Sequence, residues 1–287
     1  MRNQGYVYRE TLPATVLRDD LPTYLAAKYP HSTREEWQDR IRSGQVRLDG
    51  NSLAWHRPPW DEPDAPRTFG VLHRDRDLLA VAKPAGLPTL PGGGFLLNTL
   101  LYAVREYDSD ASPLHRLGRW TSGLVLFARN RKAMARVSRE WRRKEVRKVY
   151  RGLANGEPEK ERFEVDALIG PAPHPLLGTV HAVSAEGRSA DSRITVLERR
   201  EHCFLAEIEI GTGRPHQIRI HLAAAGHPLC GDPLYLAGGM PAPDRSAVPG
   251  DPGYRLHAME LELIHPTSGE PLRLWCRPPD VLRRGYA

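Results

Sequence analysis

The sequence predicts an α+β fold for the larger part of this chain of 287 residues. Segments with the alternating pattern of strands do not alternate regularly with helical segments, as they would in a doubly wound parallel sheet. Two short strand candidates, residues 71–72 and 78–81, follow each other across the charged turn Arg74–Asp77. Hydrophobic residues make up 40% and charged residues 26% of the chain, which is typical of globular domains. The length favours two domains, or one large and one small.

The first 56 residues predict a small domain of two short helices and a hairpin. Leu21–Lys28 has apolar residues at the spacing of one helical face. Thr33 and Glu36 form a capping-box pattern at the start of a second helix, and Gly44 is suited to end it. The dipeptide Asp49–Gly50, between alternating apolar residues, predicts the turn of a hairpin.

Residues 57–67 predict a linker. This segment has four prolines between Arg57 and Pro66, and such a segment can neither continue a helix nor form a central strand. The second domain is therefore expected to span residues 68–287.

Further elements are predicted in order behind the linker. Residues 124–128 are an uninterrupted apolar run, which indicates a buried strand, and residues 149–153 indicate another. Residues 206–210 alternate apolar and acidic side chains, so one face of that strand is expected to be buried. Residues 214–225 predict a helix, with Pro215 in its first turn.

The positive charge of the chain is concentrated in one segment. The net charge is +6, and Arg129–Lys148 contains ten basic and two acidic residues. The remaining sequence is therefore slightly acidic. An apolar seam within this segment predicts a helix, whose basic face is either a surface for a polyanion such as nucleic acid or a solvated face. The density of charge favours nucleic acid.

Several classes of protein are disfavoured by the composition. The longest apolar runs fall short of the roughly 18 residues that a membrane-spanning helix needs. The first ten residues lack an apolar signal core, so a cytoplasmic location is expected. Cys203, Cys230 and Cys276 are odd in number and far apart, which argues against a disulfide framework. His216 and His221 are five residues apart, whereas a helical metal pair needs four. No metal site is predicted.

Five segments of the second domain resemble, in content and order, the RluA-type family of RNA pseudouridine synthases. They are KPAGL at 83–87, HRLGRWTSGL at 115–124, KVY at 148–150, GRPHQIRIHLA at 213–223 and GDPLY at 231–235. The resemblance implies a mixed, largely antiparallel sheet with flanking helices. It also implies an isomerase that converts uridine to pseudouridine in structured ribosomal or transfer RNA, with no cofactor and no metal ion. The chain is expected to act as a monomer.

The N-terminal domain resembles the small alpha-L RNA-binding domain in its order of helix, helix and hairpin. That resemblance implies RNA contacts for the arginines on or next to the second helix. These are Arg34, Arg40, Arg42 and Arg47.

The family resemblance implies roles for particular residues of the second domain. Tyr150 corresponds to the tyrosine that stacks on the target base, which suits a base that must rotate before it is rejoined. Arg219 corresponds to the arginine that pairs with the catalytic aspartate. Four further basic residues are expected to contact RNA: Arg116, Arg142, Arg143 and Lys148.

One residue departs from the family pattern at its centre. The family motif has a nucleophilic aspartate after HRL, and this chain has Gly118. One interpretation is that another acid, from among Asp108, Asp110 and Asp232, enters the site and the chain is still a synthase. The other is an RNA-binding protein without catalysis. A third interpretation, an unrelated hydrolase or metal enzyme, is supported by no set of residues in the sequence.

One structural and one functional consequence are expected from this glycine. Arg219 should face the cavity without its carboxylate partner, which is costly for a buried charge. We also expect little or no synthase activity, and partial recovery in Gly118→Asp. A positive φ at Gly118 would oppose that recovery by straining the aspartate.

Overall fold

The computed structural model describes residues 1–16, 20–29, 31–243, 247–248 and 250–286. The chain forms two compact units, Met1–Pro63 and Asp64–Ala287, and the division falls within the segment expected to be the linker. No helix in the described residues is long and apolar enough to cross a membrane.

The first unit contains the predicted helices and hairpin. Its elements are β1 (Tyr6–Thr11), α1 (Leu21–Lys28), α2 (Arg34–Arg42), β2 (Val46–Asp49) and β3 (Ser52–Arg57). The capping box is present, because Thr33 accepts the Glu36 amide and Glu36 accepts the Thr33 amide. Leu25 and Trp37 are fully buried in the core of this unit.

The strand β1 is an element that the sequence pattern did not predict. It pairs with β3 in an antiparallel sheet of order β1-β3-β2. Five of its six residues are exposed, so it has no apolar face that a pattern could reveal. Residues beyond β3 fold back on the same unit, where Asn3 Nδ2 donates to Glu62 Oε1 at 2.9 Å.

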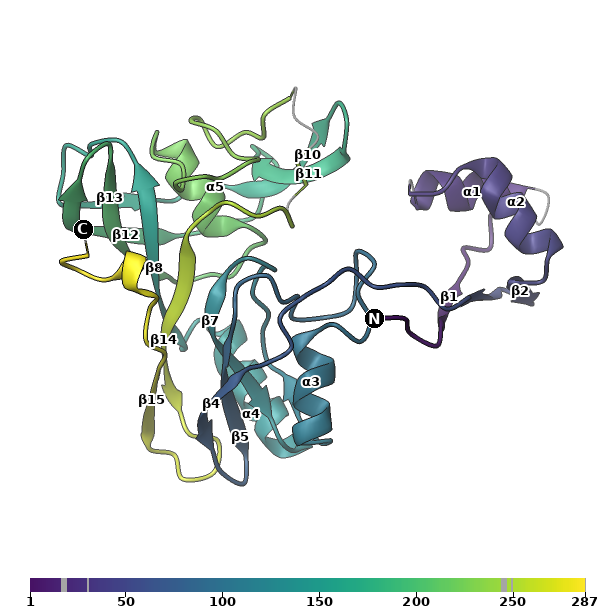
Figure 1. The fold of residues 1–287 in the computed structure, drawn as a ribbon, viewed down its shortest axis with the longest axis horizontal. Coiled ribbons are helices and arrows are strands. Elements are labelled where there is room, and N and C mark those ends of the chain that lie inside the picture. The colour runs from purple at the N-terminus through teal and green to yellow at the C-terminus, as the bar shows by residue number, and fades with distance from the viewer. Residues whose placement is uncertain (17–19, 30, 244–246, 249, 287) are drawn as a thin grey trace. The chain divides into compact units, whose positions relative to one another are not determined.

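The second unit is built around one ten-stranded sheet, and the predicted α+β fold is confirmed (Figure 1). The order along its main path is β4-β5-β7-β14-β8-β13-β12-β9, with β15 on β14 and β6 on β7. All of its pairs are antiparallel except β7 with β14. The strands are β4 (Gly70–Arg74), β5 (Leu78–Lys83), β6 (Ser112–Pro113), β7 (Ser122–Ala128), β8 (Arg147–Asn155), β9 (Arg162–Val165), β12 (Ser192–Arg200), β13 (Cys203–Ile210), β14 (Leu256–Ile264) and β15 (Pro271–Trp275).

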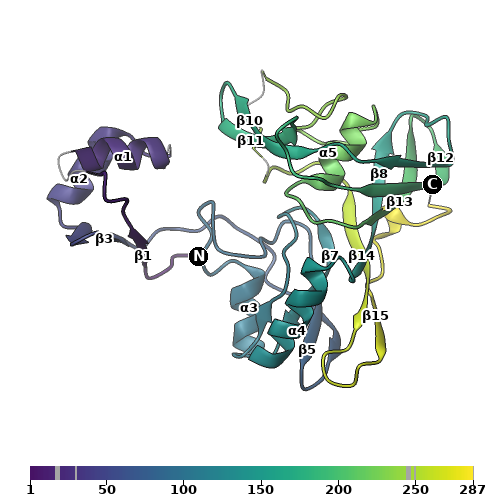
Figure 2. The same ribbon diagram turned by 180° about the vertical axis from the view of Figure 1, so that it is seen from behind.

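A separate hairpin and three helices complete this unit. They are β10 (Ile169–His174) with β11 (Gly178–Val183), and α3 (Leu100–Tyr107), α4 (Arg131–Arg142) and α5 (Gln217–Ala224). A short 3₁₀ turn at Asp280–Leu282 precedes the C-terminus. Successive residues of β5 and β7 face opposite sides, so α3 packs on one side of these strands and α4 on the other (Figures 1 and 2).

The strands β7 and β14 approach each other at Gly123. This residue has φ +112°, and a Cβ added to it would lie 2.1 Å from the carbonyl oxygen of Ala258. The glycine of the TSG motif is therefore required by the closeness of two strands. It brings the loop before β7 against the residues that precede β14.

The helix predicted from residue 214 begins later than expected. Its first residue is Gln217, and His216 precedes it in the left-handed region with φ 55°. Arg214 and Pro215 form a turn instead, because Gln217 Oε1 accepts the Arg214 amide at 3.0 Å. Almost every residue of α5 is buried, since it packs between the main sheet and the residues around β10.

Candidate active site

A cavity of about 430 Å³ gathers the motif segments of the second unit. The loop before β7, the turn before α5, Tyr150 of β8 and Tyr254 line it. The main lining residues outside α5 are Pro88, Thr89, Arg116, Gly118, Thr121, Tyr150 and Tyr254. Segments far apart in the sequence therefore form one site.

The KPAGL segment braces the loop that contains Gly118. Thr89 Oγ1 donates to the carbonyl oxygen of Leu117 at 2.9 Å and accepts its amide at 3.2 Å. The buried Lys83 ammonium donates to the carbonyl oxygen of Arg119 at 3.0 Å. Arg119 Nε donates in turn to the carbonyl oxygen of Gly86 at 3.0 Å. The loop backbone is therefore fixed on both sides of Gly118 without any help from a side chain at that position.

Burial also affects the protonation of the Lys83 side chain. Burial, with a smaller effect of the Arg119 charge, lowers the pKa of Lys83 to about 7. Two more carbonyl oxygens, of Pro84 and Leu87, accept from its Nζ at 2.8 and 2.7 Å. Lys83 thus binds three carbonyl oxygens and holds the KPAGL segment to the loop around Gly118.

A side chain at position 118 would meet two hydroxyl groups. The φ of Gly118 is not in the left-handed region, so an aspartate at this position would not strain the backbone. An added Cβ would lie 3.0 Å from Tyr254 Oη and 3.5 Å from Thr121 Oγ1. These two hydroxyl oxygens are 3.4 Å apart, and the Thr121 amide donates to the carbonyl oxygen of Gly118 at 3.1 Å. The tyrosine hydroxyl therefore occupies the space next to an absent side chain.

Arg219 has a carboxylate partner, so the expectation of an unpaired arginine was wrong. Its Nε donates to Asp232 Oδ2 at 2.6 Å and its Nη2 to Oδ1 at 2.7 Å. The two side chains are 3% and 1% exposed. Burial alone would lower the pKa of Arg219, but the hydrogen bonds and charge of Asp232 outweigh it and raise that pKa. The guanidinium also lies 4.3 Å from the centre of the Tyr254 ring.

None of the three candidate acids lines the cavity. Asp108 is buried and pairs with Arg129 at 2.6 Å, and Asp110 is exposed outside the cavity. Asp232 is held by Arg219 and by the amides of residues 234 and 235. Among the described residues that line the cavity there is no aspartate or glutamate.

Tyr150 lies on β8 in the middle of the sheet, between β13 and β14. It packs against two core clusters and also lines the cavity. Burial raises the pKa of its hydroxyl to about 12, so the ring is neutral at physiological pH. A neutral aromatic ring at the bottom of a cavity is suited to contact with a base.

The two histidines around α5 have separate partners. His216 Nδ1 lies 2.8 Å from Tyr235 Oη, which itself donates to the carbonyl oxygen of His181 at 2.8 Å. His216 Nδ1 therefore carries the proton and donates it. Burial, then the charge of Arg219, lowers the pKa of His216 to about 3. His221 contacts Ser192 Oγ and a main-chain carbonyl oxygen, so the two rings do not converge on one point.

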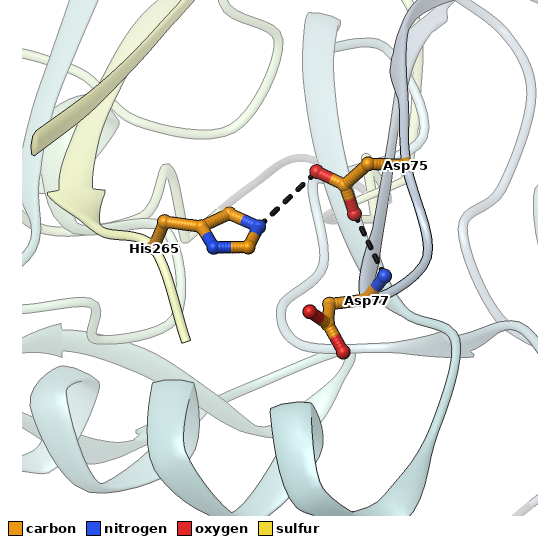
Figure 3. A group of neighbouring side chains, drawn as sticks. All are labelled: Asp75, Asp77 and His265. Carbon is orange, nitrogen blue, oxygen red and sulfur yellow. Dashed lines mark hydrogen bonds and ion pairs between the residues drawn. The ribbon is translucent and has the colours of Figure 1, made fainter. Parts of the chain in front are cut away.

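One cluster of potential metal ligands lies outside the cavity, at the turn before β5 (Figure 3). Asp75 Oδ2 contacts His265 Nε2 at 3.2 Å and His73 Nε2 at 2.6 Å, and its Oδ1 accepts the Asp77 amide at 2.7 Å. His265 Nδ1 accepts the amides of residues 267 and 268, so its Nε2 carries the proton. These hydrogen bonds stabilise the turn before β5, so the three side chains have a structural role there.

The expected RNA-contact residues are not all available. Arg34, Arg42, Arg47, Arg116, Arg142 and Arg143 are exposed. Lys148 is only 3% exposed and donates to the carbonyl oxygen of Gly211, because its strand is central in the sheet. Arg40 stacks over Trp37 with its Cζ 4.5 Å from the ring centre and donates to Ser32 Oγ at 2.8 Å. Arg40 and Lys148 therefore stabilise the fold.

The sequence reasoning missed Tyr254 and Thr89 as residues of the site. Tyr254 begins the segment YRLHAMELELIHP, but its position next to Gly118 depends on the approach of β14 to β7. Thr89 follows the KPAGL motif directly, which was the available signal.

Comparison with known proteins agrees with this arrangement. The family model described as RNA pseudouridylate synthase matches residues 77–224. An uncharacterized RNA pseudouridine synthase of Synechocystis sp. is 41% identical, over 90% of this chain and 94% of that protein. The ribosomal large subunit pseudouridine synthase D of Nitrosomonas europaea is 40% identical, over 73% of this chain and 62% of that protein. The solved structure of human RNA pseudouridylate synthase domain containing 1 has the same fold, with a TM-score of 0.59 and 24% identity over 78% of this chain and 89% of that one. This chain therefore belongs to the RNA pseudouridylate synthase family.

Proposed function

We propose that this family member binds structured RNA, takes an unstacked uridine of that RNA into the cavity, and isomerises it little or not at all. The observation that carries the proposal is the composition of the cavity. The aromatic ring of Tyr150 and the arginines of the motifs are in place, but no described lining residue has a carboxylate. A glycine can neither attack a sugar carbon nor take a proton from it.

The cavity residues can bind a nucleotide without this group. Tyr150 offers its ring to the face of the base. Arg116 is exposed at the cavity and offers its guanidinium to a phosphate. Because Arg219 is neutralised by Asp232, it holds the wall of the cavity and leaves phosphate binding to Arg116, with Arg119 and Arg214 also in the lining.

Exposed arginines elsewhere extend the contact with RNA. Arg34, Arg42 and Arg47 serve this role in the first unit, and Arg142 and Arg143 at the end of α4 in the second. Such contacts position RNA without reading its sequence, and they make the affinity fall steeply with salt. A flat dependence of affinity on salt would contradict this part of the proposal.

The second candidate function is an active synthase for ribosomal or transfer RNA. The names of the relatives favour it. It requires a reacting group other than the motif aspartate, and Asp108, Asp110 and Asp232 lie outside the described lining of the cavity. The proposed setting for either function is a monomer in the cytoplasm.

The deciding experiment measures pseudouridine in ribosomal and transfer RNA after incubation with the native chain and with Gly118→Asp. We expect RNA binding by both proteins, no turnover by the native chain and slow turnover by the variant. The backbone at position 118 would impose no strain on the aspartate, but its Cβ would lie 3.0 Å from Tyr254 Oη, so turnover should be slow. Robust turnover by the native chain would establish the second candidate and overturn the proposal. A folded Gly118→Asp protein that binds RNA but forms no pseudouridine would show that more than one side chain is missing.

A further inference from the structure

A second cavity of about 430 Å³ lies on the opposite face of the main sheet. Arg147 and Arg151 of β8 line it, whereas Tyr150 of the same strand lines the first cavity. Successive residues of a strand point to opposite faces, so the sheet separates the two cavities. Nothing in the proposed reaction uses this second cavity.

Its lining is strongly basic. Six arginines and two glutamates contribute to it, and we call the site the arginine cavity. The arginines are Arg147, Arg151, Arg273, Arg277, Arg283 and Arg284. Side chains of one sign that converge on a concave surface attract ions of the opposite sign.

The arginines at the floor of the cavity are held in place by acids. Arg147 donates to Glu260 Oε1 at 2.7 Å and to Glu209 Oε2 at 2.6 Å. Arg151 pairs with Glu207 at 3.0 Å. These pairs orient the floor and neutralise much of its charge. The attraction for an anion must therefore come from the rim.

Two arginines at the rim can supply this attraction. Arg277 and Arg284 are exposed, and in the part of the chain that the structure describes neither has an ion pair. Burial lowers the pKa of Arg151, the charge of Glu207 raises it, and the charge of Arg284 has a smaller lowering effect, so Arg284 repels a guanidinium that is already paired with Glu207. An anion between them would relieve that repulsion.

An exposed aromatic ring adjoins these arginines. Trp275, at the end of β15, is 51% exposed and lines the same cavity. Large aromatic rings that remain in solvent beside cations are typical of surfaces that bind unpaired nucleotides, where the ring stacks on a base. An acidic peptide would use the arginines but would have no need of the ring.

We propose that the arginine cavity binds an unpaired stretch of the RNA substrate, with phosphates on Arg277 and Arg284 and a base on Trp275. This inference rests on the proposed function, because it assumes that the chain binds structured RNA. It adds a second contact on the far face of the sheet. The RNA must then extend around the edge of the second unit.

The test compares two double charge reversals in the full chain. Arg277→Glu with Arg284→Glu changes the cavity, and Arg105→Glu with Arg162→Glu changes two exposed arginines elsewhere by the same net charge. Affinity for ribosomal RNA fragments with unpaired loops is measured over a range of salt concentrations. The cavity variant should bind roughly tenfold more weakly than the control variant, and the slope of log affinity against log salt should fall by about 1.4 to 1.8.

Trp275→Ala provides an independent measurement. It should weaken binding at least fivefold, with no change in the salt slope, because stacking releases no counterions. If the cavity and control variants bind RNA equally well, the inference is overturned. The proposed function is upheld in that case, as long as the native chain binds RNA. If the native chain binds no RNA, both are overturned. Loss of polyglutamate binding in the cavity variant, with unchanged RNA affinity, would instead assign the site to an acidic protein.

Discussion

The two walls of the first cavity are built in different ways. The wall that α5 forms is buried, and its charge is neutralised within the fold, since Arg219 and Asp232 are 3% and 1% exposed. The opposite wall is the loop around Gly118, in which Arg116 and Gly118 are exposed. The backbone of Leu117 and Arg119 is hydrogen-bonded to the side chains of Thr89 and Lys83, and the Arg119 side chain donates to the carbonyl oxygen of Gly86. The Leu117 side chain packs in the same core cluster as Leu87.

The difference shows why one wall tolerates a glycine at its centre. A loop that is fixed through its backbone keeps its path whatever side chain position 118 has. On the α5 wall, by contrast, removal of one charged partner leaves the other buried alone. The side chain at position 118 is thus separable from the fold, whereas the buried Arg219 is not. The following predictions test this contrast.

The largest effect on the reaction is expected from a double substitution at the loop wall. Gly118→Asp places its Cβ 3.0 Å from Tyr254 Oη, so the new carboxylate must share its space with a hydroxyl. Tyr254→Phe removes that hydroxyl and keeps the ring against Arg219. The double variant should form pseudouridine at roughly ten times the rate of Gly118→Asp alone, because small errors in position are costly for reacting groups.

The matched control is Tyr254→Phe in the native background. It should bind RNA as the native chain does and form no pseudouridine. Equal rates for the double variant and for Gly118→Asp would show that Tyr254 does not obstruct the aspartate.

At the α5 wall the largest effect should be on stability. Asp232→Asn removes the charge that neutralises Arg219 in a buried pair, and this typically costs about 3–5 kcal/mol. Urea unfolding followed by circular dichroism measures the change. Asp110→Asn, at an exposed carboxylate, should change the free energy of unfolding by less than about 0.5 kcal/mol. A similarly small loss for Asp232→Asn would refute the claim that this wall depends on the pair.

Stability should also fall in mild acid. Burial is the main cause that lowers the pKa of His115 and His216 to about 3 and of His257 to about 4. Unfolded histidines have a pKa near 6.5, so between pH 6.5 and 4 the unfolded chain binds protons that the folded chain excludes. The free energy of unfolding should then decrease by up to about 1.4 kcal/mol per pH unit for each histidine as the pH falls.

Urea unfolding at a series of pH values from 7.5 to 5 measures this slope. His115→Gln keeps an acceptor for the Leu126 amide and should make the slope shallower. Parallel slopes for the native chain and this variant would exclude His115 as a contributor.

Substitution of Tyr150, which lines the first cavity, should cost less than Asp232→Asn does. Tyr150→Ala should weaken RNA binding by about 1–3 kcal/mol through the loss of stacking. Tyr150→Phe keeps the ring and should bind nearly as the native chain does. Affinity is compared for RNA with an unpaired uridine and for a fully paired duplex. If Tyr150→Ala weakens both equally, the base does not reach the ring.

Much of the fold follows from short-range signals. The capping box at Thr33 and Glu36 and the turn at Asp49–Gly50 predicted the first unit, since each depends on residues a few positions apart. The apolar run at residues 124–128 predicted a buried strand and residues 78–81 predicted a strand, and both β7 and β5 are present and buried. By contrast, β1 has no apolar face and forms only because β3 offers it a free edge.

In the candidate site, too, some features follow from the sequence and others only from the tertiary structure. The sequence determined the motif segments, the glycine at 118 and the tyrosine at 150, because each can be read at its own position. The tertiary structure decided that Asp232 neutralises Arg219, that Tyr254 places its hydroxyl beside Gly118, and that Lys148 lies inside the sheet. The physical reason is that charge pairing and close packing depend on which segments meet in space. The pairing of β7, β8 and β14 brings Tyr254 to Gly118 and places Lys148 inside the sheet, and no local sequence pattern reveals that pairing.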